Sequence, residues 1–322
     1  MSGMQDPWNT LTFDSILTET EKVTGLKLSN LVIQRNSYVN RVYELTVKQS
    51  NQKLIVKFYR PGRWTKQMIQ EEHNFLFELA SAELPVIVPL IFNKQTLFNF
   101  NDINFTIFPK KGGRAIDELN QDSWTLVGRL LGRIHLIGKP IQHSKRIIWT
   151  PEKATKKSLN YLLTNDFIPI DYMVSIERVA DFFMQKASLL FKQEPLFLIH
   201  GDCHLGNLIH RPEEGIYLVD FDDMCIGPAV QDLWMLLPGN VKQCDKEINW
   251  FIDGYETFSS FNLQSLQLIP ILKVMRMIHF ASWCALQSND ASFKKHFPDW
   301  GSTQYWNQLI REIQENVYDY EE

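Results

Sequence analysis

The sequence predicts an α+β fold in two lobes, a small β-rich N-terminal lobe followed by a larger helical C-terminal lobe. Segments rich in β-branched and aromatic residues dominate the first part of the chain, whereas helical hydrophobic spacing dominates the second. The clearest break lies between them, at Pro109-Lys110-Lys111-Gly112-Gly113. We therefore expect lobes at residues 1–108 and 114–322, joined by a hinge at residues 109–113.

The N-terminal lobe is predicted to be a small sheet with one long helix. Strands are expected at residues 30–32, 42–47, 53–58, 96–100 and 104–108. The polar stretch 48–52 between the second and third of these is typical of a hairpin turn. A helix is expected at residues 65–82, because Ile69, His73 and Leu76 recur near helical spacing.

The C-terminal lobe is predicted to be mainly helical. Helices are expected at residues 124–136, 176–191, 244–258, 265–284 and 303–317. Two short strands, at 196–199 and 216–221, are expected on either side of a polar loop at 201–207. A cleft between two such lobes is a common place for a nucleotide.

Composition excludes several classes of protein. The chain has 322 residues, 44% of them hydrophobic and 22% charged, with a formal net charge of -4. There is therefore no overall positive field to hold nucleic acid or an anionic membrane, and we expect neither as a partner. The first 12 residues do not resemble a secretory signal, and four scattered cysteines without a CxxC pair fit a reducing cytoplasm.

The strongest chemical signal is a loop with a carboxylate and a carboxamide, followed by a second carboxylate. Asp202 and Asn207 stand five positions apart after a predicted strand, and Asp220 follows thirteen positions later at the end of another. Asn207 and Asp220 offer the oxygen ligands that Mg²⁺ prefers, and Asp202 could accept or orient the proton of an acceptor hydroxyl. These are the groups that phosphoryl transfer from ATP requires.

The spacing matches the protein-kinase catalytic loop H-R-D-x-x-x-x-N and the D-F-G motif that follows it. Here the motifs read His200-Gly-Asp202 and Asp220-Phe-Asp222. The glycine in place of arginine and the aspartate in place of the last glycine are typical of the aminoglycoside and choline kinase branch. Each carboxylate alone could be a turn or cap residue, but their order favours a kinase with Asp202 and Asp220 as catalytic residues.

The N-terminal lobe supplies partners for the phosphates. Lys57 is the last residue of Leu54-Ile-Val-Lys57, which resembles the kinase V-A-I-K strand, although a solvent-facing lysine is the alternative. We expect Glu72 to pair with Lys57, because the apolar residues that follow lie on its helical face, and we expect Glu71 to be solvated.

The nucleotide is expected to contact a loop and a hinge. The loop at 36–43 contains no glycine, so Ser37 and Asn40 would have to offer polar groups to the phosphates, or the loop is an ordinary hairpin turn. The hinge segment contains Phe108 and Lys110, and its backbone is predicted to read the adenine edge.

These motifs, and others spread over nearly the whole chain, resemble the bacterial stress response kinases of the aminoglycoside/choline phosphotransferase-like family. The most specific parts are His200-Gly-Asp-Cys-His204 with Gly206-Asn207, and the stretch 227–237. The resemblance implies a monomeric cytoplasmic enzyme that transfers phosphate from ATP to Ser/Thr of proteins, including itself, under envelope or oxidative stress. It also implies that Asp202 accepts the proton, that Asn207 and Asp220 hold magnesium, and that Ser37 touches ATP.

Two alternatives remain open at this stage. Acidic residues in the helical tail, among them Asp245 and Glu247, leave room for a small-molecule kinase acting on an aminoglycoside, choline or a similar alcohol. The missing glycines leave room for a pseudokinase that only binds. A P-loop ATPase is excluded because no G-x-x-x-x-G-K-[ST] occurs. We expect Cys203 to fill the core and Asp232 to anchor the catalytic loop through backbone hydrogen bonds.

Overall fold

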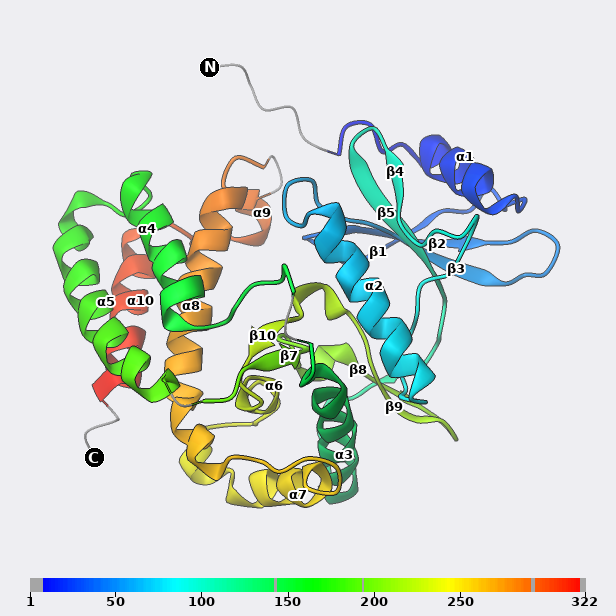
Figure 1. Cartoon of the computed structure of the whole chain (residues 1–322). Coiled ribbons are helices and arrows are strands. Elements are labelled where there is room, and N and C mark those ends of the chain that lie inside the picture. Colours follow the sequence, from blue (N-terminus) through cyan, green and yellow to red (C-terminus); the bar gives the residue numbers. More distant parts are fainter. Residues whose placement is uncertain (1–7, 142–143, 193, 291–292, 319–322) are drawn as a thin grey trace. The chain divides into compact units, whose positions relative to one another are not determined.

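The computed structural model describes residues 8–141, 144–192, 194–290 and 293–318, and these residues form two compact units (Figure 1). The first unit contains the described parts of Met1–Ser123, His143–Lys145 and Leu205–Asp222. The second contains those of Trp124–Gln142, Arg146–His204 and Asp223–Glu322. The boundaries predicted at 108 and 114 stay a prediction, but the segment 205–222 packs with the first unit.

A five-stranded antiparallel sheet forms the body of the first unit. Its strand order is β1-β2-β3-β5-β4. The strands are β1 (Ile33–Arg35), β2 (Arg41–Thr46), β3 (Lys53–Phe58), β4 (Phe98–Phe100) and β5 (Ile103–Pro109). Lys57 on β3 lies opposite Val42 of β2 on one side and Thr106 of β5 on the other. The register therefore places this lysine in the middle of the sheet rather than at an edge.

Helix α2 (Lys66–Ser81) follows β3 and packs beside the sheet (Figure 1). Thr65 caps its N-terminus, where the threonine hydroxyl accepts a hydrogen bond from the Met68 N–H at 3.2 Å. Ile69 and Leu79 are fully buried on the side of α2 that faces the core. The predicted helix at 65–82 is confirmed, with its two end residues acting as caps.

Some elements of the first unit differ from the prediction. The prediction of a strand at residues 30–32 is wrong, because β1 begins at Ile33. An unpredicted helix, α1 (Phe13–Thr24), starts at a capping box formed by Thr12 and Ser15 and ends at Gly25, whose φ is 70°. Its polar residues obscured the single apolar stripe that contains Ile16.

A second sheet of the first unit contains the chain around Asn207. Its three strands are β6 (Arg114–Ala115), β8 (Leu208–Arg211) and β9 (Gly215–Leu218), in the order β6-β8-β9. Short 3-10 turns, Leu205–Asn207 and Phe221–Asp223, adjoin β8 and follow β9. The strand predicted at 216–221 therefore ends early, and β8 was missed because its alternation is only four residues long.

Among its described residues, the second unit is mainly helical and contains the strand pair β7 (Phe197–Ile199) with β10 (Cys225–Gly227). Its helices are α3 (Gln121–Gly138, which begins in the first unit), α4 (Lys156–Thr164), α5 (Ile170–Phe191), α6 (Val230–Trp234), α7 (Asp245–Tyr255), α8 (Ile269–Gln287), α9 (Phe293–His296) and α10 (Thr303–Tyr318). A π-helical turn, Pro151–Thr155, precedes α4, and 3-10 turns lie at Val241–Gln243 and Leu263–Leu268. The five predicted helices correspond to α3, α5, α7, α8 and α10.

Helix α8 is the central helix of this unit, in contact with α4, α6 and α10 (Figure 1). The segment Leu263–Gln287 is long and apolar enough to cross a membrane by length and composition, but 61% of its most apolar stretch is buried inside the protein. That burial is what a core helix of a folded domain shows, so its hydrophobicity is explained by packing.

Candidate active site

A pocket of about 370 Å³ opens in the first unit beside the five-stranded sheet. Its walls come from the loop between β1 and β2, from β3, from α2, from the end of β5 and from the turn after β9. Six of the predicted site residues line it: Ser37, Lys57, Glu72, Phe108, Lys110 and Asp220. The volume lies in the range of small-ligand sites. Residues far apart in the sequence are thus brought to one cavity, as a nucleotide site requires.

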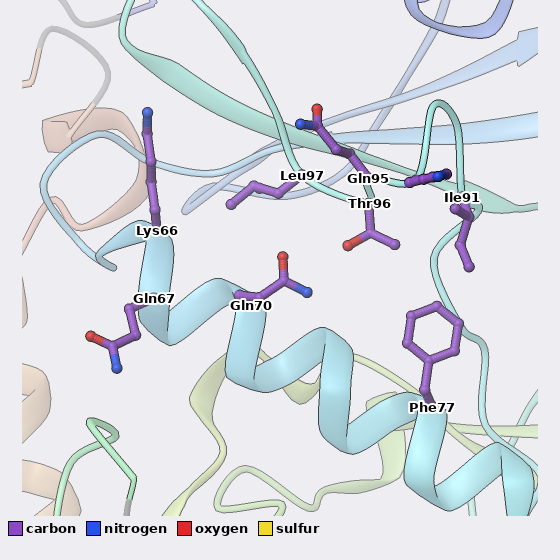
Figure 2. A pocket seen from close by; sticks show the side chains of 9 residues that line it. Lys66, Gln67, Gln70, Phe77, Ile91, Gln95, Thr96 and Leu97 are labelled. Carbon is purple, nitrogen blue, oxygen red and sulfur yellow. The ribbon is translucent and has the colours of Figure 1, made fainter.

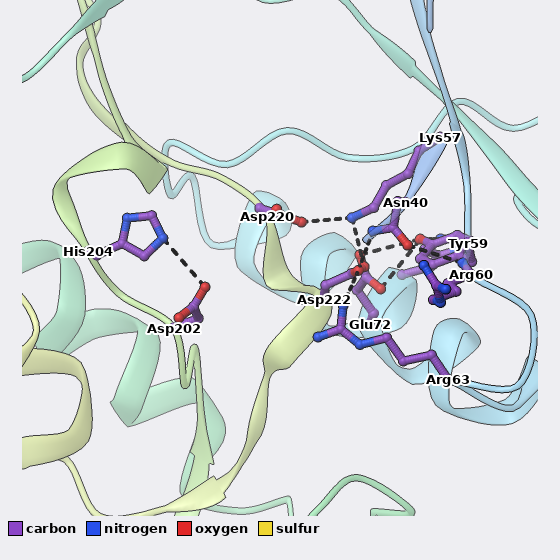
Figure 3. A network of polar contacts seen from close by, with 11 residues as sticks. Asn40, Lys57, Tyr59, Arg60, Arg63, Glu72, Asp202, His204, Asp220 and Asp222 are labelled. Carbon is purple, nitrogen blue, oxygen red and sulfur yellow. Dashed lines mark hydrogen bonds and ion pairs between the residues drawn. The ribbon is translucent and has the colours of Figure 1, made fainter. Parts of the chain in front are cut away.

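Lys57 is the electrostatic centre of this pocket (Figure 3). Its ammonium group lies 2.7 Å from Asp220 Oδ1 and 2.7 Å from Asp222 Oδ1. Burial alone would lower the pKa of Lys57, but the charges of Asp220, Asp222 and Glu72 outweigh burial and raise the pKa. Lys57 therefore carries a positive charge at every physiological pH.

Asp222 is a buried member of this cluster. Its carboxylate accepts a hydrogen bond from Asn40 Nδ2 at 2.6 Å and lies 3.9 Å from the Arg63 guanidinium. Burial opposes ionisation, yet Lys57 and Arg63 hold the pKa of Asp222 below its usual range. Asn40 also accepts from the Arg60 N–H at 3.2 Å, so side chains tether the glycine-free loop to the turn after β9.

The two neighbouring glutamates of α2 have different roles. Glu72 is buried, receives hydrogen bonds from the Tyr59 hydroxyl at 3.4 Å, and contributes to the raised pKa of Lys57. Glu71 instead accepts from Ser144 Oγ at 2.7 Å and from the Lys145 N–H at 3.0 Å. The expectation that Glu71 is solvated is therefore wrong, because it holds the segment 144–145.

The hinge residues Phe108 and Lys110 both line the pocket, but several of their groups already make contacts with other residues. The Lys110 N–H donates to the Lys53 carbonyl at 3.0 Å, and its ammonium lies 2.7 Å from Glu44. Glu44 is buried and also pairs with Lys53 and Arg35, a cluster that sequence reasoning missed. The ring of Phe108 meets His73 edge-on at 6.5 Å. An adenine ring would need polar groups of the hinge other than the Lys110 N–H.

Asn207 and Asp220 are placed by the second sheet of the first unit. The Asn207 carbonyl accepts a hydrogen bond from the Val219 N–H at 3.0 Å, so the two residues stand at adjoining chain segments. Asp220 has a φ of 62°, an uncommon conformation for a residue with a side chain that often marks functional sites. One carboxylate and one carboxamide, with phosphate oxygens and water completing the shell, fit the oxygen chemistry of Mg²⁺.

The loop that carries Asp202 lies in the second unit and is fixed by Asp232. The Asp232 carboxylate accepts from the His200 N–H at 2.8 Å, from the Gly201 N–H at 2.7 Å and from His135 at 3.0 Å. The predicted anchoring role of Asp232 is confirmed.

Gly201 has a φ of 82°, and a Cβ added there would lie 2.4 Å from the Asp223 carbonyl oxygen. Only glycine fits this close approach, which explains why the motif has no arginine here.

Asp202 is held between the side chains of Arg276 and His204. Its Oδ1 lies 2.8 Å from Arg276 on α8, and its Oδ2 lies 3.5 Å from His204 (Figure 3 shows the latter pair). Burial would raise the pKa of Asp202, but the hydrogen bond from His204 and the charge of Arg276 lower it to about 2. Asp202 is therefore ionised at neutral pH. No local sequence signal pointed to Arg276, which follows far along the chain.

Cys203 is fully buried beside this loop. Burial and the neighbouring Asp232 raise the pKa of its thiol well above the usual value, so the thiolate is not accessible at neutral pH. The expectation that Cys203 fills the core is confirmed.

A second pocket, of about 510 Å³, lies between α2 and the segment before β4 (Figure 2). It is lined by Lys66, Gln67, Gln70, Phe77, Ile91, Lys94, Gln95, Thr96 and Leu97. None of these described residues is Asp or Glu. Without carboxylate ligands it does not offer the hard oxygen donors that phosphoryl transfer needs, so the candidate active site is the pocket around Lys57.

His73 is predicted to make the first unit sensitive to acid. Its ring bonds the Thr96 hydroxyl at 2.8 Å and the Tyr59 hydroxyl at 3.2 Å, and burial together with the charge of Lys57 lowers its pKa from 6.5 to about 3. Between these values the unfolded chain binds the proton and the folded chain does not, so stability falls as pH decreases. We expect a loss of about 2 kcal/mol on going from about pH 7 to pH 5, measured by urea unfolding.

The matched variants separate His73 from other titrating groups. His73→Gln keeps polar atoms for both hydroxyls but cannot titrate, so its unfolding free energy should change less over the same pH interval. His210→Gln removes an exposed histidine of β8 and should keep the full wild-type change. Equal pH dependence in wild type and His73→Gln would show that His73 is not the acid-sensitive group.

Comparison with known sequences gives the family context. The chain matches the phosphotransferase enzyme family over residues 32–269. Stress response kinase A of Shigella flexneri is 34% identical over 314 residues, which cover 95% of this chain and 92% of that protein. The serine/threonine protein kinase RdoA of Salmonella typhimurium is 33% identical over 310 residues, 92% of each.

Solved structures share the fold at lower identity. Amicoumacin kinase hAmiN, in complex with AMP-PNP, Ca²⁺ and Ami, has a TM-score of 0.74 at 20% identity over 95% of this chain and 93% of that one. Spectinomycin phosphotransferase APH(9)-Ia, with ADP and spectinomycin, has a TM-score of 0.66 at 17% identity over 96% and 99%. Choline kinase LicA from Streptococcus pneumoniae has a TM-score of 0.64 at 17% identity over 94% and 99%. The predicted kinase-like fold is confirmed.

Proposed function

We propose a protein kinase activity from the premise that the chain belongs to the phosphotransferase enzyme family. A kinase activity follows from that membership and from kinase-named relatives over most of the chain. The finer proposal is that the enzyme transfers the γ-phosphoryl group of ATP to serine or threonine hydroxyls of proteins, including its own. We also propose that it acts as a cytoplasmic monomer, in keeping with its four free, buried cysteines.

The observation that carries the proposed chemistry is the pocket around Lys57. A triphosphate there would meet the Lys57 ammonium, which would exchange its contact with Asp220 for one with a phosphate oxygen. Ser37, in the loop over the pocket, would offer its hydroxyl and backbone to the phosphates. Asn207 and Asp220 would hold Mg²⁺, which would neutralise charge on the phosphates when bound.

Asp202 is assigned to the acceptor. The acceptor hydroxyl oxygen forms a bond to the γ-phosphorus, the bond to the β-phosphate oxygen breaks, and the hydroxyl proton passes to Asp202 and then to water. With a pKa held at about 2, Asp202 is a weak base, so it orients the hydroxyl and takes the proton late in the reaction. Late proton transfer agrees with the loose transition state of phosphoryl transfer.

The choice of a protein acceptor rests on the relatives. The names that mention a stress response and serine/threonine kinases belong to proteins 33% to 34% identical over most of the chain. The kinases of amicoumacin, spectinomycin and choline share the fold at 20% identity or less. The nearer relationship therefore favours protein hydroxyls over a small alcohol.

A labelled-phosphate assay tests the proposal. The purified protein is incubated with γ-labelled ATP and Mg²⁺, alone, with a generic protein acceptor, or with a panel of aminoglycosides and amino alcohols. We expect label in protein bands, its own included, and almost none with the Asp202→Ala variant. Label in small alcohols but not in protein would reject the proposal in favour of a small-molecule kinase, and ATP binding with no transfer to any acceptor would indicate a pseudokinase.

A further inference from the structure

The side chains around Asp202 form a cationic and aromatic surface on α8 and α9 of the second unit. From this surface we infer that the acceptor is an acidic segment of polypeptide, with carboxylate side chains flanking the serine or threonine. The inference rests on the proposed function, because it names the acceptor class of that same site. It concerns the second unit alone.

The cationic part of the surface begins beside Asp202, at Arg276. Arg276 and His204 contact the two carboxylate oxygens, and both keep about two fifths of their side-chain area exposed, at 42% and 41%. Lys273 lies one helical turn before Arg276 on α8 and is half-buried. Helix α8 carries no Asp or Glu between Ile269 and Gln287. An acceptor that approaches Asp202 along α8 therefore meets no negative side chain on this helix.

The aromatic part continues along the same helix. Phe280 follows Arg276 by four residues, so both lie on one face of α8. Its ring, 43% exposed, stacks on Trp283 at 5.7 Å and meets Phe297 at 5.8 Å. The short helix α9 adds Lys294 and Lys295, both exposed, just before Phe297. The surface thus runs from Arg276 over two turns of α8 to α9.

The charge pattern discriminates between acceptor classes. A cationic aminoglycoside or choline brought to Asp202 would lie near Arg276 and Lys273, and the like charges would repel each other. A carboxylate near the acceptor hydroxyl would pair with these residues, and apolar side chains of a peptide could pack on Phe280. The length of the surface suits an extended segment better than a single small alcohol.

An acidic acceptor would also act on Asp202. Arg276 and His204 each contact one oxygen of Asp202, so an acceptor hydroxyl would have to share the carboxylate with these side chains or displace one of them. A substrate carboxylate that draws the half-exposed Arg276 toward itself would release Oδ1 for that hydroxyl. Arg276 is thereby a positioning residue whose partner changes when the acceptor binds.

Peptide kinetics test the inference. Three synthetic peptides with one serine, flanked by Asp/Glu, by Ala or by Lys/Arg, are compared as acceptors at saturating ATP. We expect kcat/KM for the acidic peptide to exceed that for the basic peptide by about tenfold or more, with the ratio shrinking as salt is added. Lys273→Glu should raise KM for the acidic peptide by about tenfold with kcat retained, because Lys273 does not contact Asp202 in the structure.

Lys246→Glu makes the same charge change at an exposed position of α7 and should leave the kinetics of all three peptides unchanged. Arg276→Lys should retain the preference for the acidic peptide. Equal rates for the three peptides, or the same effect from Lys246→Glu as from Lys273→Glu, would overturn the inference and leave the protein kinase function intact. No labelled peptide together with a labelled amino alcohol would overturn the proposed function as well.

Discussion

Replacing Asp220 with alanine is expected to lower phosphoryl transfer by about 10³-fold and to abolish the Mg²⁺ dependence of nucleotide binding. Asp220 is 52% exposed at the pocket, so it can meet a metal ion, unlike the buried Asp222. Its loss leaves Asn207 as the single predicted protein ligand. Lys57 would keep its contact with Asp222, so the pocket should retain its charge and the chain should remain folded.

The measurement is nucleotide affinity by calorimetry, with and without Mg²⁺, beside the transfer assay. Wild type should bind ATP more tightly when Mg²⁺ is present, and Asp220→Ala should show the same weak affinity in both conditions. Glu214→Ala, which removes a carboxylate paired with Arg211 at the β8–β9 turn, should behave as wild type. Retained Mg²⁺ dependence in Asp220→Ala would mean that the metal is held elsewhere.

Local patterns in the sequence predict the elements and the order of the catalytic groups. The β-branched and aromatic content of residues 53–58 predicts β3 with its observed bounds, and α2 is predicted to within one residue at each end. The spacing of Asp202, Asn207 and Asp220 is itself local, because it spans one loop and one hairpin. Such features are fixed by neighbours in the chain, so a single sequence contains them.

Contacts between distant segments could not be predicted in the same way. Asn40 and Asp222 are 182 positions apart and still form a 2.6 Å hydrogen bond. Arg276 reaches Asp202 from α8, and nothing in its neighbouring residues distinguishes it from a surface arginine. Residues 205–222 belong to the first unit because β8 pairs with β6. Both strands are too short to be predicted from an alternation of polar and apolar residues.

The second large effect is expected at Asp202. Asp202→Ala should lower transfer by about 10³-fold while leaving nucleotide affinity and its Mg²⁺ dependence unchanged. The residues that line the nucleotide pocket all belong to the first unit, whereas Asp202 belongs to the second. Its partners Arg276 and His204 are exposed enough to be hydrated when the carboxylate is removed, so the loss of stability should be small. Full turnover in Asp202→Ala would refute the assigned mechanism.

Asp202→Asn and the pH profile separate the two roles of this carboxylate. Asparagine still accepts a hydrogen bond from the acceptor hydroxyl but does not take its proton. If Asp202→Asn is as inactive as Asp202→Ala, proton acceptance is the larger contribution. If Asp202→Asn keeps substantial activity, orientation of the hydroxyl is the larger contribution. The pKa of Asp202 lies at about 2, so its protonation begins far below neutral pH. Asp202 should therefore produce no fall in kcat/KM between about pH 8 and pH 5, because it stays ionised throughout that interval. An acid limb within this interval would have to come from a group other than Asp202.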